Sequence, residues 1–77
     1  AALSVNSTDG TIYVAWADEA GGAGFAYGDM SAGFTAAQLT VDHTVLQAVP
    51  KVTSTGNHLL IGLLGSTEIS MATMTAP

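Results

Sequence analysis

The chain of 77 residues is 48% hydrophobic and only 9% charged, and six acidic residues against one lysine leave a formal net charge of −5. With a single lysine and no arginine it is poorly suited to bind nucleic acid or an anionic membrane, because phosphate contacts need cationic side chains. A chain this short buries only a thin core and has no cysteine that could form a stabilising disulfide. We therefore expect one domain that is completed by assembly with other copies of the chain.

Short strands dominate the predicted structure, and nothing in the sequence resembles a long helix. Residues 2–7 are predicted to form the first strand, which ends at a turn around Asp9 and Gly10. Residues 11–17 form the clearest strand, and both of its faces are apolar, as expected of a strand between two layers. One face carries Ile12, Val14 and Trp16, and the other carries Tyr13, Ala15 and Ala17.

A polar, glycine-rich loop over residues 18–24 comes next, followed by a third strand over residues 25–30. Residues 34–41 are predicted to form a fourth strand, with a single helical turn over residues 35–39 as the alternative. A connector then leads to Pro50, which suits the start of an edge strand because proline donates no ladder hydrogen bond.

The C-terminal part repeats this order of elements. A turn at residues 54–57 leads into predicted strands at residues 58–64 and 68–75, after which no counterpart of the fourth strand follows. The sheet edge that this leaves unpaired invites a strand from another copy of the chain.

The two parts are also similar in sequence. Residues 5–8 return 47 positions later as residues 52–55, and at the same offset Trp16 meets Leu63. Beyond a loop that is shorter by three residues, an offset of 44 gives the pairs Phe25 with Ile69, Tyr27 with Met71, Met30 with Met74 and Ser31 with Thr75. A period of about 45 residues is the size of one β-propeller blade.

We therefore predict an all-β domain over residues 1–77, with about seven short antiparallel strands in two blade-like repeats. The first repeat covers about residues 1–44, and the second covers about residues 45–77 and lacks a last strand. Because a single repeat of this kind cannot bury its faces alone, we expect oligomerisation to complete the domain.

Two segments resemble the Asp-box repeats, or bacterial neuraminidase repeats, of sialidase-like β-propellers. Residues 12–18 are similar to the aromatic-rich strand of those repeats, which ends in Trp-x-Asp. Residues 29–36 are similar to a degenerate form of their Ser-x-Asp-x-Gly-x-Thr-Trp hairpin. Two positions match, namely Gly33 and Thr35, and three depart from the motif, namely Asp29, Ser31 and Ala36. The resemblance covers nearly the whole chain.

The resemblance implies an architecture and not an activity. Sialidases hold the substrate carboxylate with an arginine triad, and this chain has no arginine. Some lectins with two-blade chains close a six-blade ring as trimers and bind sugars between blades, so the resemblance implies a sugar site between blades. The second repeat of this chain lacks its last strand, and in this it differs from the complete blades that close such a ring.

Candidate catalytic or metal-binding groups are few. His43 and His58 are the groups that titrate near neutrality, but adjacent side chains on a strand point to opposite faces, so Asp42 and His43 make no dyad. The carboxylates of residues 18–19 supply too few oxygen ligands for calcium. We predict no catalytic residue, no metal site and no cofactor, and therefore no enzyme.

Two groups of apolar side chains are candidate contact residues. Tyr13, Trp16 and Tyr27 are candidate ligand-binding residues because a sugar ring stacks on an aromatic face. Of these we expect the tyrosines to be exposed, and Trp16 to belong with Phe25 to the core. The candidate self-association residues are Leu59, Leu60, Ile61, Leu63 and Leu64, since both faces of that apolar strand need cover.

These features favour a non-enzymatic, self-assembling structural module, of the kind found in virion coats, virion decoration or filaments. The alternative is a carbohydrate-binding, lectin-like oligomeric β-propeller. The expected partners are copies of the chain itself and, in the alternative, a glycan. No apolar run approaches the roughly 18 residues of a membrane span, so we expect no membrane insertion. The expected location is extracellular or on a virion surface.

Overall fold

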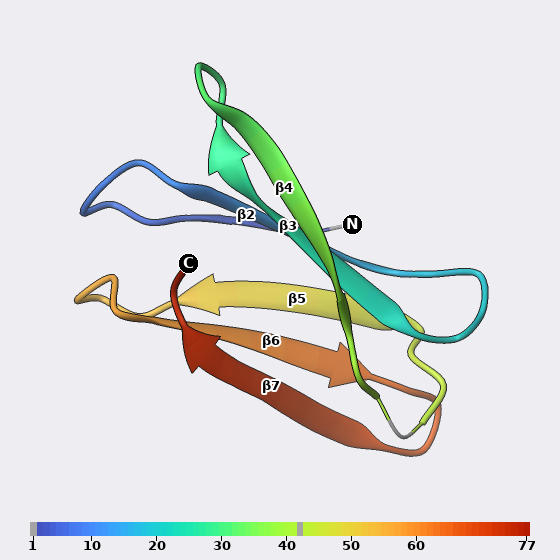
Figure 1. Ribbon diagram of the computed structural model, residues 1–77. Helices are drawn as coiled ribbons and strands as arrows, with labels where there is room; N and C mark the ends of the chain where they lie inside the picture. Colours follow the sequence, from blue (N-terminus) through green and yellow to red (C-terminus); the bar gives the residue numbers. More distant parts are fainter. Residues whose placement is uncertain (1, 42) are drawn as a thin grey trace.

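The computed structural model describes residues 2–41 and 43–77, and in these residues the chain forms seven strands and no helix (Figure 1). The strands are β1 (Ala2–Val5), β2 (Ile12–Ala17), β3 (Ala23–Asp29), β4 (Gly33–Leu39), β5 (Gln47–Val52), β6 (His58–Leu64) and β7 (Ile69–Thr75). The prediction of an all-β fold with seven short antiparallel strands is confirmed. Residues 35–39, for which one helical turn was the alternative, lie in β4.

The strands form two sheets, each of which follows chain order. One sheet has the order β1-β2-β3-β4 and the other has the order β5-β6-β7, with every neighbouring pair antiparallel. The backbones of the two sheets approach each other where β1 and β2 pass β5. The β3–β4 hairpin, in contrast, rises away from the second sheet (Figure 1).

The core lies between the two sheets. Buried side chains come from β3 and from alternate positions of β2, β5 and β6, such as Tyr13 and Ala15 on β2 and Leu59, Ile61 and Leu63 on β6. The predicted division of β2 into two faces is confirmed, because Tyr13 and Ala15 are buried whereas Ile12, Val14 and Trp16 remain partly exposed. The strands alternate because successive side chains of an extended chain point to opposite faces.

A buried asparagine joins the turns of the two repeats. The side-chain nitrogen of Asn6 donates a 3.1 Å hydrogen bond to the carbonyl oxygen of Gly56, and its side-chain oxygen accepts one from the amide of Thr8. Burial of an amide is tolerated when its donors and acceptors are satisfied. Asn6 therefore holds the β1–β2 turn against the β5–β6 turn.

The first half of the sequence repeat corresponds to an exact structural repeat. Leu3 pairs with Val14 in one hairpin, and Pro50 pairs with Ile61 in the other, so both partners move by the same 47 positions. The turns agree as well, because Asn6 and Thr53 donate equivalent backbone hydrogen bonds to the residue five positions later.

The predicted register of the second half of the repeat is wrong by two residues. Tyr13 pairs with Tyr27 in the first sheet, and its counterpart Leu60 pairs with Thr73 in the second. Tyr27 therefore corresponds to Thr73, at a spacing of 46, and the loop before β7 is shorter by one residue instead of three. A two-residue slip keeps every side chain on its face, so the hydrophobic pattern could not detect it.

Candidate assembly surfaces

The outer face of the four-stranded sheet, called here the front face, is apolar across all four strands. It consists of Leu3, Val5, Ile12, Val14, Trp16, Ala26, Phe34 and Ala36, with Gly24, Gly28 and Gln38 among them. Gly24 pairs with Trp16, and a Cβ at Gly24 would lie 2.7 Å from Cζ2 of the indole ring. The glycine therefore lets the indole lie close against β3, on the face away from the core.

The outer face of the three-stranded sheet, called here the back face, is also largely apolar. It consists of Gln47, Val49, Lys51, Leu60, Gly62, Leu64, Ile69, Met71 and Thr73. Ile69 and Met71 are among the most exposed large apolar side chains of the chain. Antiparallel sheets that face water on one side usually carry polar residues there. Two apolar outer faces are typical of sheets that pack on further layers.

The predicted self-association residues divide between the core and the back face. Leu59, Ile61 and Leu63 are buried against the four-stranded sheet, so they are not available to another copy in the folded chain. Leu60 and Leu64 point to the back face and are partly exposed. Of the two faces of this strand that we expected to need cover, the first sheet of the same chain covers one, and the other is partly exposed.

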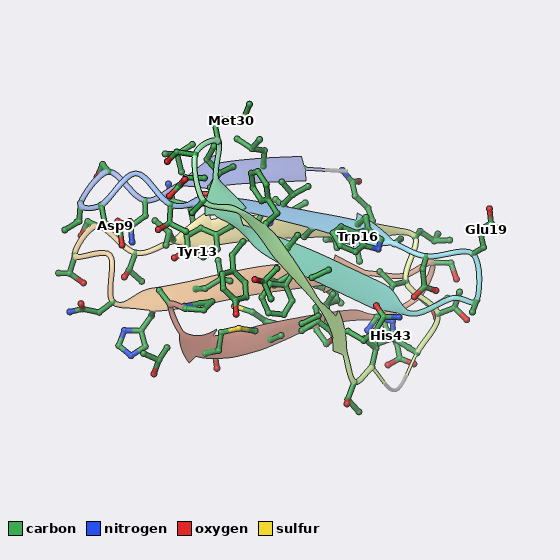
Figure 2. The ribbon with its side chains drawn as sticks, turned by 45° about the horizontal axis from the view of Figure 1, so that its top comes forward. Asp9, Tyr13, Trp16, Glu19, Met30 and His43 are labelled. Carbon is green, nitrogen blue, oxygen red and sulfur yellow. The ribbon has the colours of Figure 1, made fainter. Side chains whose placement is uncertain are left out.

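The three candidate ligand-binding aromatics do not form one platform. Tyr13 is completely buried, so the expectation that it is exposed is wrong, and its hydroxyl donates a 3.1 Å hydrogen bond to the carbonyl oxygen of Pro77. Tyr27 is partly buried beside Phe25, with ring centroids 6.1 Å apart. Trp16 lies on the opposite face of β2, partly exposed, whereas we expected it in the core. Figure 2 shows Tyr13 and Trp16 at separate places along the sheet.

The structure brings His43 beside a serine that the sequence did not single out. Nε2 of His43 lies 2.8 Å from Oγ of Ser70 on β7, and Nδ1 lies 3.2 Å from the carbonyl oxygen of Thr44. If Nδ1 donates to that carbonyl, Nε2 accepts the serine hydroxyl hydrogen, as a base does from a nucleophile. The orienting group is a backbone carbonyl and not a carboxylate. The pair attaches the connection between the sheets to β7.

A depression beside this pair is open to solvent, and the carboxylate of the acidic residue that lines it is already hydrogen-bonded. It has a volume of about 490 Å³ and is lined by Asp18, Gln38 and His43, among others. One carboxylate oxygen of Asp18 accepts hydrogen bonds from the amides of Ala20 and Gly22, so it closes its own loop. Glu19 points away from the sheets at the same loop (Figure 2). Within residues 2–41 and 43–77 no three His, Cys, Asp or Glu residues lie together as metal ligands would.

From the sequence we also considered a pair of Asp42 and His43. Asp42 lies outside the described residues. His58, the other candidate, is exposed at the start of β6, as expected. The proximity of His43 to Ser70 could not have been found from the sequence, because 27 residues separate them and only the fold brings them together.

Two aspartates stabilise turns through backbone amides. Asp29 accepts hydrogen bonds from the amide of Ala32 at 2.6 Å and from the amide and hydroxyl of Ser31, each at 2.9 Å. The amide of Ala32 is the main cause that lowers the pKa of Asp29 below the ordinary value of 3.8. The amide of Thr11 lowers the pKa of Asp9 in the same way. Such bonds favour the ionised form.

These pKa shifts predict an acid-sensitive fold. A carboxylate whose pKa is lower in the folded chain stabilises it above the unfolded pKa, and this contribution is lost as the pH falls through the folded pKa. We expect the midpoint of urea unfolding to decrease as the pH falls below about 4, and less steeply in the double variant Asp9→Asn, Asp29→Asn. Glu19→Gln removes one charge at an exposed loop and serves as the control. An identical pH profile in the double variant would contradict the prediction.

No family model, curated protein or solved structure matches this chain. No helix that could cross a membrane is present in the part of the chain that the structure describes. The fold and its surfaces define the class of the protein: an all-β module of two antiparallel sheets, packed face to face, each of which leaves an apolar outer face.

Proposed function

We propose that the chain is a non-enzymatic structural module that works by assembling with copies of itself, as proteins of virion coats, virion decoration or filaments do. The observation that carries this proposal is the pair of apolar outer faces on a chain in which only 9% of residues are charged. Full burial of one exposed Ile, Leu, Met or Val side chain contributes about 1.5–3 kcal/mol, so several such side chains on each face provide a driving force for association.

The arrangement of charges supports the same proposal. The described acidic residues lie in the turns and at the ends of strands, at Asp9, Asp18, Glu19, Asp29 and Glu68. The strands of the front and back faces carry no carboxylate, although Asp18 is hydrogen-bonded to Gln38 at the end of the front face, and Lys51 is the one charged residue on the back face. Contact surfaces between proteins are depleted of charge at their centres. A location on a virion or outside the cell belongs to this proposal.

A second candidate function is that of a carbohydrate-binding oligomeric β-propeller. It is favoured by the succession of two antiparallel sheets in chain order that pack face to face, as neighbouring propeller blades do. The partly exposed indole of Trp16 offers an aromatic surface on which a sugar ring can stack. In this candidate function the partners are copies of the chain and a glycan.

The test is the absolute mass in solution, from light scattering behind a sizing column at several micromolar concentrations. The proposal expects species larger than the 7.7 kDa chain that persist on dilution. A folded monomer at all of these concentrations would overturn it. The assembled protein is then applied to a glycan array. Specific binding would favour the lectin-like candidate, and assembly without glycan binding would favour the structural role.

A further inference from the structure

We propose that copies of this chain assemble head to tail, so that the front face of one copy packs on the back face of the next in the way the two sheets pack within one chain. This inference rests on the self-assembly proposed above and identifies the surfaces that carry it. It follows from the structural repeat, because each exposed outer face corresponds to a buried inner face of the other sheet.

The front face has a buried counterpart. At the spacing of 47 residues, Ile12, Val14 and Trp16 on β2 correspond to Leu59, Ile61 and Leu63 on β6. These three side chains of β6 are 0–3% exposed because the first sheet covers them. Val5, which is 50% exposed, corresponds in turn to Val52, which is 7% exposed. The front face is thus a second copy of a surface that the chain already buries.

The back face has a buried counterpart as well. At the observed spacing of 46 residues, Ile69 and Met71 on β7 correspond to Ala23 and Phe25 on β3. Ile69 and Met71 are 80% and 60% exposed, whereas Ala23 and Phe25 are 1% and 6% exposed under the second sheet. The back face therefore repeats the surface of the first sheet that faces the core.

One chain accordingly contains one formed interface and the two halves of another. In the core, the inner face of the first sheet packs on the inner face of the second sheet. The inner face of the first sheet corresponds to the back face, and the inner face of the second sheet corresponds to the front face. The free surfaces are one face of each type, on opposite sides of the chain. Contact between two different faces is heterologous, and repeated contacts of this kind close into a ring or continue as a filament.

The composition of the two faces allows this contact. The strands of neither face carry a carboxylate, and the one at the end of the front face, Asp18, is hydrogen-bonded to Gln38, so burial of the two faces places no pair of like charges together, although each chain has a net charge of −5. Lys51 is the charged side chain of the back face, and because it lies on the edge strand β5 its long side chain can keep the ammonium group in water at the border of the contact. Gly28 on the front face and Gly62 on the back face have no side chain, which allows another sheet to approach closely at these positions.

The test uses two variants, each blocked on one face. Val5→Asp places a charge on the front face, and Met71→Asp places one on the back face. Both side chains are at least half exposed in the single chain, so the core does not depend on them. Ser54→Asp adds the same charge at the exposed β5–β6 turn and is the matched control. Circular dichroism verifies the fold of each variant, and light scattering gives its mass.

We expect the unmodified chain and Ser54→Asp to assemble, and each blocked variant alone to be a monomer. An equimolar mixture of Val5→Asp and Met71→Asp is expected to form a one-to-one dimer, because the intact back face of the first variant meets the intact front face of the second. Mass spectrometry under native conditions identifies the two chains in that dimer.

Three results would overturn the inference. A blocked variant that dimerises alone would indicate contact between identical faces or between strand edges. A mixture of monomers, with the unmodified chain still assembled, would show that the chain assembles through other surfaces and would leave the proposed function intact. A monomeric unmodified chain would overturn both. Should either variant lose its fold, Leu3→Asp and Ile69→Asp block the same two faces at more exposed positions, 61% and 80%.

Discussion

Replacing Tyr13 with alanine is expected to lower the free energy of unfolding by about 3–5 kcal/mol, as for other large aromatic side chains removed from a core. Tyr13 is fully buried between the sheets, and its hydroxyl is hydrogen-bonded to the carbonyl of Pro77. A domain of this size has a total stability of roughly 4–12 kcal/mol, so we expect the variant to be largely or partly unfolded at 37 °C. Urea unfolding followed by circular dichroism measures the change.

Tyr13→Phe is the matched control for this experiment. It keeps the ring and removes only the hydroxyl, so the expected loss is about 0.5–1.5 kcal/mol. A Tyr13→Ala variant with the stability of the unmodified chain would contradict the burial of the ring. Because Tyr13→Ala acts on folding, it is unsuitable as a test of glycan binding, whereas Tyr27 and Trp16 are partly exposed and better suited.

Replacing Ile61 with alanine is expected to cost about 2–5 kcal/mol of unfolding free energy, because the side chain is completely buried on β6. The repeat supplies a matched control in Val14→Ala, at the corresponding position of β2. Val14 lies on the front face and is partly exposed, so its truncation is expected to affect the single chain less and the assembly more.

Two measurements separate these effects. Urea unfolding at a concentration low enough to dissociate the assembly reports the stability of the single chain, and light scattering reports the dissociation on dilution. Equal losses of single-chain stability for Ile61→Ala and Val14→Ala would contradict the distinction between the core and the front face.

The His43–Ser70 pair is better explained as a structural contact than as a catalytic one. A catalytic serine and histidine work with a third group that orients the imidazole and with donors for the developing oxyanion. Here a backbone carbonyl is the orienting group, and the pair joins the connection between the sheets to β7.

The apolar composition of β2 and β6 illustrates how far a hydrophobic pattern leads. Both strands are apolar on both faces, which predicted strands that lie between layers, but the single chain covers only one face of each strand. The pattern could not indicate which face the same chain covers. For that reason Leu59, Ile61 and Leu63 were grouped with Leu60 and Leu64 as contact residues, although the core buries the first three.

The sequence by itself determined the number and order of the strands, the turns that end the first strand of each repeat and the two faces of β2, because these depend on neighbours within a few residues and on the twofold period of a strand. The fifth strand was predicted to start at Pro50, but β5 starts at Gln47 and Pro50 is buried inside it. Only the tertiary structure decided which face of each sheet lies inside, the 46-residue spacing between β3 and β7, and the contact of His43 with Ser70. Each of these depends on how two sheets stack, and stacking brings together residues that are far apart in the chain. A face that is apolar has the same local pattern whether this chain covers it, as at Ile61, or leaves it open, as at Val14.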